Sequence, residues 1–488
     1  MRACAVVASL LLSLCIGCYR VLPGAGGGRV KANPDRPINA ADISVESGYA
    51  ITPVAAGLTF PTGVTWDDQN RMYVVESGYS YGEVFTSPRL LRVEPDGNLT
   101  TIATGENNGP WNGVVFSRGA FYVAEGGSMD GGRLLRITPD GKIERVVDHI
   151  PSGGDHHVDG PIAAPDGTIY FSTGTMTNSG VVGDDDWRFG WLRRHADWHD
   201  VPCRDITLTG ENFEIPDPRK EGGKATVTSG AFVPFGTPTT KGQVIKGSVP
   251  CSGGLFRIAA GGNAPELVAW GFRNPWGLAF GPDGKLYVTD NGYDQRGARP
   301  VWGAADWLWR VDPASPGTWY GWPDYSDGRS VTETRYKGNY RQPTRLLAED
   351  PNPPQQPVAL FGCHSSSNGI DFSRSDKFGH VGEAFVAQFG DQAPVTGKVL
   401  GAVGFKVVRV NVDNGIIEEF AINAGKKNGP ASMLKSGGLE RPLSVRFSPD
   451  GSALYIVDFG ILQMSDKGAA PVKGTGVLWR VTRGNGEG

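Results

Sequence analysis

One phrase of about 17 to 27 residues recurs along this 488-residue chain, and it constrains the fold more than any other feature. Each copy has a short strand near a glycine, a turn that is often Pro-Asp-Gly, and a second strand rich in aromatic and β-branched residues. Proline presets φ in such a turn and glycine accepts positive φ. Periodic repetition of this kind indicates a repeat architecture. The six copies are Thr62–Gly78, Trp111–Gly127, His157–Gly174, Arg273–Gly292, His364–Gly390 and Arg441–Gly460.

A second strand phrase, of the type Leu-Leu-Arg-Val, follows each copy. Six pairs of phrases in one order indicate six units of at least three strands. We therefore predict an all-β fold, a six-bladed β-propeller of four-stranded antiparallel blades, since a β-solenoid would need shorter and more uniform repeats. The 71 glycines and 35 prolines argue against a helical bundle. The arginines of the second phrase, which we expect to be structural, are Arg92, Arg136, Arg257, Arg310, Arg409 and Arg480.

The last copy has only three strands before the chain ends. The segment Tyr49–Leu58 has the pattern of the missing fourth strand, so we expect the N- and C-terminal strands to pair and close the ring, which removes an exposed edge. The propeller is then expected over residues 48–482, with large insertions near 175–250 and 312–362 and a tail at 483–488.

The N-terminus has the pattern of an export signal. An apolar stretch from Ala5 to Ile16 ends at Gly17-Cys18, which resembles a bacterial lipobox. We expect residues 1–18 to be a signal peptide with Cys18 lipidated, and residues 19–47 to be a flexible tether. The expected location is the periplasm or the outer membrane, with a lipid anchor as the membrane attachment. A plain secretory peptide and the absence of export are the alternatives.

Charge and cysteine content narrow the possible partners. A net charge of −4 and a pI near 6.0 give no reason to expect nucleic acid as a partner. No two cysteines of the propeller show close metal-ligand spacing, which argues against zinc. In an oxidising compartment Cys203 and Cys251 could close the first insertion and leave Cys363 free.

Residues that precede the first strand of each blade should meet at one mouth of the central channel. Loop residues on a rigid scaffold are frequent carriers of function. Some of these side chains could equally be surface or channel-wall residues. Within the first insertion, 186–200 is rich in Trp and either packs on itself or forms a lid or partner surface, and its two histidines are weak candidates for a metal site. The residues expected at the mouth are Pro61 and Thr62, Trp111 and Asn112, His157 and Asp159, Arg273 and Asn274, His364 and Ser365, and Arg441.

The segment Trp270–Gly297 (WGFRNPWGLAFGPDGKLYVTDNGYDQRG) resembles the pyrroloquinoline-quinone-dependent sugar dehydrogenases, the soluble glucose/sorbosone dehydrogenase-like family. The segments His364–Phe372 and Gly404–Val410 are also similar to that family, and Trp319–Pro323 resembles its sorbosone-dehydrogenase-like branch. The resemblance implies a six-bladed propeller that carries pyrroloquinoline quinone and Ca²⁺ on its top face. It also implies a small sugar substrate and an external electron acceptor, a cytochrome or a quinone.

The resemblance further assigns roles to individual positions. His157 matches the histidine general base, with Asp159 as a neighbouring carboxylate, and the carbonyls of Gly292 and Tyr293 match the calcium ligands. Two positions depart from the pattern: His156 stands where the family has a carboxylate, and residues 387–391 contain no lysine. The positions expected to contact the quinone are Arg273, Asn274, Arg441, His364 and Trp111.

The function expected from the sequence is therefore hydride transfer from a sugar or sugar-like alcohol or aldehyde to the quinone. A neutral imidazole is a suitable proton acceptor at neutral pH, and a guanidinium suits negative charge on a reduced quinone. Two alternatives stay open: a calcium-dependent propeller hydrolase of the lactonase type, and a non-catalytic propeller that binds protein or glycan at the envelope.

Overall fold

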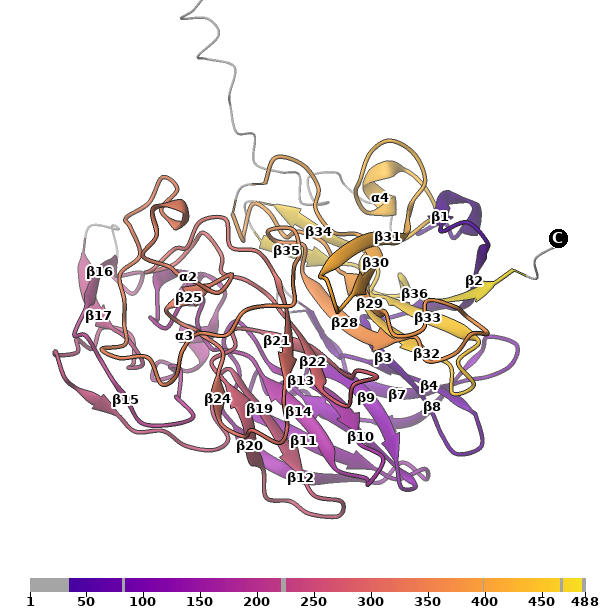
Figure 1. Ribbon diagram of the computed structural model, residues 1–488, viewed down its shortest axis with the longest axis horizontal. Helices are drawn as coiled ribbons and strands as arrows, with labels where there is room; N and C mark the ends of the chain where they lie inside the picture. The colour runs from indigo at the N-terminus through magenta and orange to yellow at the C-terminus, as the bar shows by residue number, and fades with distance from the viewer. Residues whose placement is uncertain (1–34, 81–83, 221–224, 398, 466–467, 485–488) are drawn as a thin grey trace, which may run out of the picture.

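Six antiparallel sheets radiate around a central channel in the computed structural model, which describes residues 35–80, 84–220, 225–397, 399–465 and 468–484 (Figure 1). This confirms the predicted six-bladed propeller. The first three blades are β3 (Pro61–Trp66), β4 (Met72–Glu76), β7 (Arg89–Val93) and β8 (Leu99–Thr104); β9 (Trp111–Ser117), β10 (Ala120–Glu125), β11 (Gly132–Ile137) and β12 (Ile143–Ile150); and β13 (Val158–Ala163), β14 (Ile169–Thr173), β19 (Gly254–Ile258) and β20 (Glu266–Trp270), extended by β24 (Thr318–Trp319).

The remaining blades complete the ring. They are β21 (Pro275–Phe280), β22 (Leu286–Asp290), β23 (Trp307–Val311) and β27 (Ala359–Leu360); β28 (Ser367–Phe372), β29 (Ala384–Gln388), β30 (Lys406–Asn411) and β31 (Ile416–Asn423), extended by β1 (Ile43–Val45); and β32 (Pro442–Phe447), β33 (Ala453–Asp458), β36 (Gly476–Arg483) and β2 (Tyr49–Leu58).

The ring closes as the sequence predicts, because β2 is the outer strand of the sixth blade. It pairs antiparallel with β36, from Tyr49 opposite Arg483 to Leu58 opposite Gly476. Arg36 adds a second tie, since its guanidinium donates to the carbonyl of Thr475 and to the carboxylate of Asp458. The first and last strands of the sixth blade, β2 and β36, thus close the ring within one sheet.

Glycine permits the inner strands to approach one another closely. Gly113 has φ of +85°, and a Cβ built on it would lie 1.7 Å from the carbonyl oxygen of Gly160 in the next blade. No other residue fits such a contact without backbone movement. Gly63, Gly277 and Gly369 at the same position of other phrases also lie against the neighbouring inner strand, whereas the sixth phrase has Ser444 there.

Five of the six arginines of the second phrase, Arg92, Arg136, Arg257, Arg310 and Arg409, form ion pairs with acidic side chains, which fits their expected structural role. Arg92 pairs with Glu94 at 2.7 Å, and Arg409 contacts Glu46 and Glu383 at 2.9 and 2.7 Å. Pairs of this kind are partly exposed and contribute little each.

Two long excursions leave the propeller. The first, between β14 and β19, contains α2 (Asp184–Arg188), α3 (Trp191–Arg194), β15 (Ile206–Thr207), β16 (Asn212–Pro216), β17 (Thr226–Gly230) and β18 (Val244–Ile245). The second, between β23 and β27, contains β24, β25 (Tyr325–Ser326), β26 (Arg329–Ser330) and η2 (Thr334–Tyr336). Shorter elements elsewhere are η1 (Ala40–Asp42), β5 (Tyr79–Ser80), β6 (Val84–Phe85), α4 (Ala431–Leu434), β34 (Leu462–Ser465) and β35 (Gly468–Pro471).

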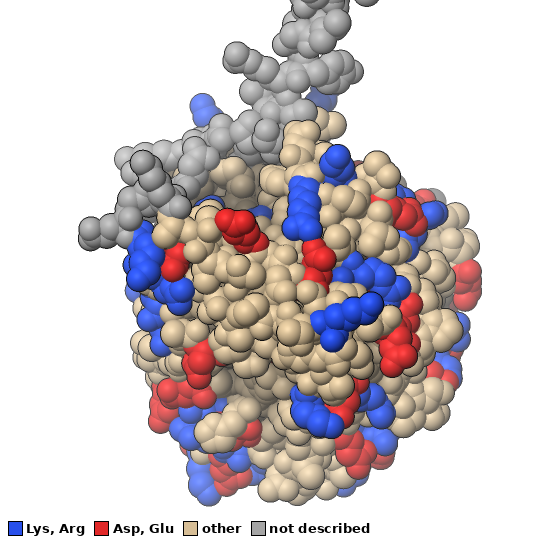
Figure 2. All heavy atoms as spheres, turned by 90° about the vertical axis from the view of Figure 1, so that its left-hand side faces the viewer, with Lys and Arg blue, Asp and Glu red and all other residues tan. Residues whose placement is uncertain are grey.

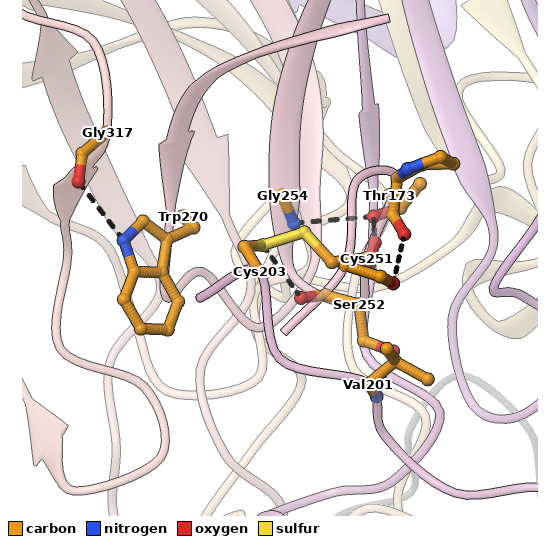
Figure 3. Close-up of a disulfide and its surroundings, with 10 residues drawn as sticks. Thr173, Val201, Cys203, Cys251, Ser252, Gly254, Trp270 and Gly317 are labelled. Carbon is orange, nitrogen blue, oxygen red and sulfur yellow. Dashed lines mark hydrogen bonds between the residues drawn. A yellow bond between two sulfur atoms is a disulfide. The ribbon is translucent and has the colours of Figure 1, made fainter. Parts of the chain in front are cut away.

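The predicted disulfide between Cys203 and Cys251 is present and fastens the first excursion to the start of β19 (Figure 3). The carbonyl of Cys251 also accepts a hydrogen bond of 2.6 Å from the hydroxyl of Thr173, at the end of β14. Cys363 is free, as expected. The two ends of the excursion are thus held together beside the central channel.

On the side of the molecule that carries the first excursion, acidic and basic side chains are interspersed among a broad uncharged surface (Figure 2). Within the described ranges, no helix has the length and apolar character needed to cross a bilayer. The expected signal peptide and the lipidated Cys18 lie outside the described residues, as does most of the expected tether.

Candidate active site

A cavity of about 160 Å³ lies at the end of the channel where the inner strands begin. It brings together most of the residues that the repeat pattern placed there. One side is apolar, formed by Trp276, Phe389, Leu443 and Phe459, and the rest is polar. The sequence-predicted residues that line it are Thr62, Asn112, His157, Asp159, Arg273, Asn274, Gly292 and His364.

His157 precedes β13 and lies in an aromatic enclosure. Its ring meets Tyr79 and Trp191 edge-on, with centroids 5.8 and 6.2 Å away. Neither ring nitrogen makes a hydrogen bond of normal geometry among the described residues. Burial lowers the pKa of His157 to about 4, and an interaction with the backbone of Gly126 only partly opposes this. The imidazole is therefore neutral at pH 7.

His156, the neighbouring cavity residue, has a defined tautomer. Its Nδ1 lies 2.9 Å from the carbonyl oxygen of Thr175. A carbonyl accepts but cannot donate, so Nδ1 carries the proton and Nε2 holds the lone pair. Burial lowers the pKa of His156 well below its ordinary value, and Arg273 and Arg296 lower it further. His156 is thus a second neutral histidine with an assigned acceptor nitrogen.

Arg273 is held by a buried network centred on Asn178. Its Nη2 donates to the Asn178 side-chain oxygen and to Asp294, both at 2.9 Å, and its Nε donates to the Asn178 carbonyl. The side-chain amide of Asn178 donates in turn to the carbonyls of Asp294 and Arg296. This geometry fixes the guanidinium at the cavity wall.

Arg296 joins three carboxylates from separate segments. It contacts Asp155 and Asp185 at 2.6 Å each and Asp294 at 2.8 Å. Burial raises the pKa of Asp185 to about 6 even though Arg296 opposes the shift. Burial also opposes ionisation of Asp294, but Arg273 and Arg296 outweigh it and lower the pKa of that carboxyl. The guanidiniums of this wall are therefore already matched by carboxylates.

His364 and Asp159 occupy other parts of the wall. Nδ1 of His364 lies 3.5 Å from Asp294, and burial lowers the pKa of His364 despite this partner. Burial raises the pKa of Asp159 well above its ordinary value, against a hydrogen bond from Asn112. Burial therefore disfavours the charged form of Asp159.

Three predicted site residues do not present their side chains to the cavity. Trp111 is buried and its Nε1 donates to Glu125 at 2.8 Å. Arg441 is buried between the rings of Phe389 and Phe405, with its Nη1 3.1 Å from the carbonyl of Gly390. The hydroxyl of Tyr293 donates to the carbonyl of Tyr325. These side chains brace the blades, although Gly292, next to Tyr293, lines the cavity.

The sequence analysis missed several cavity residues. Asp294 and Arg296 belong to the segment Trp270–Gly297 that carries the family resemblance, but they follow a strand and do not precede one. Phe189 and Trp191 come from the first excursion, where only the abundance of tryptophan gave a signal. His156 was recognised as a departure from a family pattern and not as a functional candidate.

Residues 245–418 match the family model described as glucose/sorbosone dehydrogenase. Three solved structures share the fold. A PQQ-bound aldose sugar dehydrogenase from Streptomyces coelicolor has 15% identity and a TM-score of 0.50, over 90% of this chain and 99% of that chain. The holo PQQ domain of a pyranose dehydrogenase from Coprinopsis cinerea has 14% identity and a TM-score of 0.53, over 92% and 99%.

The third is the calcium structure of a Trichoderma reesei carbohydrate-active enzyme of family AA12, with 14% identity and a TM-score of 0.54, over 91% and 98% of the two chains. No match was found among the curated proteins. At such identities the structural likeness shows the fold, and the sorbosone-dehydrogenase-like branch stays a prediction. The match over residues 245–418 confirms the resemblance stated from the sequence: this chain is similar to the glucose/sorbosone dehydrogenases, in a propeller that all three solved structures share.

Proposed function

We propose that the chain is a quinoprotein dehydrogenase that oxidises a sugar or sugar-like alcohol or aldehyde, with pyrroloquinoline quinone and Ca²⁺ as cofactors. The observation that carries the proposal is the convergence of Arg273, Asn274, Gly292 and His364 on one cavity, because all four lie in the segment that matches the family model. The similar structures that contain PQQ or calcium support the cofactors.

The cavity residues fit a flat, aromatic cofactor with oxygen atoms at its edge. Trp276, Phe389 and Phe459 offer apolar surface to a ring system, and Arg273 and Asn274 would hold its oxygen atoms. Lys406 follows the lysine-free segment 387–391 in the chain, but it pairs with Glu419 and would not hold the cofactor. Trp111 and Arg441 are not among the proposed quinone contacts, because Trp111 donates a hydrogen bond to Glu125 and Arg441 donates to the carbonyl of Gly390.

The carbonyl oxygens of Gly292 and Tyr293 would hold Ca²⁺. They follow β22, and the amide of Gly292 donates to the carboxylate of Asp306 at 2.9 Å, which places a further oxygen donor beside them. The described residues contain no group of three or more His, Cys, Asp or Glu that could hold a metal, so main-chain oxygens and exogenous ligands would dominate. A hard cation prefers such oxygen ligands, and the two cofactors together would supply a Lewis acid and a hydride acceptor.

In this mechanism a neutral histidine takes the proton of the substrate hydroxyl. We assign this role to His157, because it opens the third blade at the channel mouth and is neutral at pH 7. His156 is the competing candidate, since its Nε2 is the acceptor nitrogen. Asp159 would orient the substrate or the imidazole, and His364 would form part of the pocket wall.

Paired substitutions separate the two histidines. The apo-protein is incubated with Ca²⁺ and the quinone, and dye reduction is followed over a sugar panel. We expect His157→Ala to bind the quinone normally and to reduce dye 10²–10⁴-fold more slowly, the usual loss for a positioned base. If His156→Ala shows that loss and His157→Ala does not, the base is His156. If wild type binds no quinone or oxidises no sugar, the dehydrogenase proposal fails.

A matched experiment tests the cofactor contacts. Replacement of Arg273 by Ala should weaken quinone binding in a fluorescence titration, whereas Arg310→Ala, at a strand arginine outside the cavity, should leave it unchanged. Wild-type affinity in Arg273→Ala would show that Arg273 only braces the channel wall. We further propose that the chain is exported, with Cys18 lipidated, and that an external acceptor receives the electrons.

A further inference from the structure

The first excursion places two aromatic side chains, Phe189 and Trp191, on the cavity wall. Neither belongs to a repeated phrase, so ring closure does not explain them. Phe189 is half-buried, whereas only 5% of Trp191 is exposed. These two side chains therefore give the polar cavity an aromatic surface for substrate contact. This surface comes from the insertion and not from the repeated strands of the propeller.

The ring of Trp191 is fixed from two directions. It meets His157 edge-on at 90° with centroids 6.2 Å apart, and the guanidinium of Arg194 lies over the indole, 4.7 Å from its centroid. Edge-to-face and cation–π contacts both restrict the orientation of an aromatic ring. Trp191 is therefore held beside the proposed base.

The indole N–H of Trp191 is the one polar atom of this side chain, and it is unsatisfied. It is buried and has no hydrogen-bond partner among the described residues. Tryptophan can only donate, so an oxygen acceptor is required, and a buried donor without one is costly. A ligand that supplies an oxygen atom would remove that cost.

The excursion that carries Trp191 is anchored to the propeller at several points. Asp185 of α2 is paired with Arg296, and Asp200 accepts hydrogen bonds of 2.7 and 2.5 Å from the amide of Met176 and the hydroxyl of Thr177. The Cys203–Cys251 disulfide follows directly after. The wall is thus preorganised, which lowers the cost of binding a ligand against it.

The charged side chains on this wall of the cavity limit the class of ligand that can bind there. On this side of the cavity the guanidiniums of Arg273 and Arg296 face the carboxylates of Asp155, Asp185 and Asp294 at hydrogen-bond distance. No guanidinium of this cluster is left with an uncompensated charge. A sugar acid would meet carboxylates, whereas a neutral sugar brings hydroxyl oxygens and an apolar C–H face.

We propose that Trp191, together with Phe189, is a specificity-determining wall that receives the ring of a neutral hydroxylated sugar, with the indole N–H donating to one of its oxygens. The inference rests on the proposed function for the placement of the reacting carbon near His157. The sugar contact itself does not require turnover.

The test measures binding and turnover separately. Saturation-transfer NMR is run with D-glucose, D-galactose, D-xylose and D-gluconate on protein with and without Ca²⁺ and the quinone. The variants are Trp191→Phe, which removes only the N–H, Trp191→Ala, and the control Trp187→Phe. Trp187 lies on α2 in the same excursion under Arg193 and outside the cavity lining.

We expect at least one neutral sugar to bind and gluconate not to bind. Trp191→Phe should weaken the neutral sugar about 2- to 12-fold, the value of one hydrogen bond, Trp191→Ala should weaken it further, and Trp187→Phe should not change it. Wild-type binding in both Trp191 variants, no binding of any neutral sugar, or binding of gluconate equal to glucose would overturn the inference. Unchanged KM values in Trp191→Ala, with dye still reduced, would overturn it and leave the dehydrogenase proposal intact. Sugar binding that depends on Trp191 in a protein that takes up no quinone would support this inference and would refute the dehydrogenase proposal.

Discussion

The neutral state of His157 predicts a measurable dependence of folding stability on pH. Burial lowers the pKa of this side chain from 6.5 to about 4 in the folded protein. In the unfolded chain the imidazole takes a proton near pH 6.5. Between pH 6.5 and pH 4 the unfolded chain therefore binds a proton at this histidine, whereas the folded protein does not. The free energy of unfolding is consequently highest above pH 6.5 and falls as the pH is lowered toward 4. At 1.36 kcal/mol per pH unit, the loss is about 3 kcal/mol.

His157→Phe isolates this contribution. Phenylalanine fits between Tyr79 and Trp191, sacrifices no hydrogen bond of normal geometry and does not titrate. Urea unfolding is measured from pH 7 to pH 4, and the free energy of unfolding of wild type relative to the variant should fall by about 3 kcal/mol over this range. Buried carboxyls such as Asp306 titrate in both proteins and cancel in the comparison.

Selective ¹³C labelling of the seven histidines gives a direct measurement, since the His157 signal should not shift between pH 8 and pH 5. Parallel stability curves for wild type and His157→Phe, or a His157 signal that titrates near 6.5, would refute the argument that its burial keeps it neutral.

Three further outcomes are expected. Replacement of Cys203 and Cys251 by Ala should destabilise the protein by about 4 kcal/mol in the chain-entropy model for a 48-residue separation, measured by urea unfolding; an unchanged midpoint would count against it. Arg296→Gln leaves the buried carboxylates of Asp155 and Asp185 without their guanidinium partner and should cost about 3–5 kcal/mol, whereas Arg188→Gln at an exposed pair should cost under about 1 kcal/mol; equal losses would contradict the network. Mass spectrometry of the native protein should find an N-terminus at lipidated Cys18, and an unmodified start within residues 19–30 would exclude the anchor.

The repeated phrases were sufficient to predict the propeller, because strand, turn and strand recur in one order and the fold follows from their count. The same phrases positioned the cavity residues only to within one residue. Pro275 lies opposite Asp290, and Pro442 lies opposite Asp458, so Arg441 is equivalent to Asn274 and not to Arg273. Asn274 lines the cavity, whereas the longer side chain of Arg441 at the equivalent position lies between the rings of Phe389 and Phe405. The repeat position alone therefore does not determine which side chains enter the cavity.

The ion pairs of Arg296 could not be predicted, because they join segments that no sequence pattern connects. Arg296 meets Asp155 across 141 residues and Asp185 across 111, and the phase of the repeats says nothing about either pair. The repeated strands build a channel mouth that any six-bladed propeller would have. Discrimination between substrates must then reside in what is not repeated: the loop after β22, with Asp294 and Arg296, and the excursion that brings Trp191. Since Arg296 binds both the loop and the excursion, a change in either one alters the charge and the aromatic wall around the histidines together.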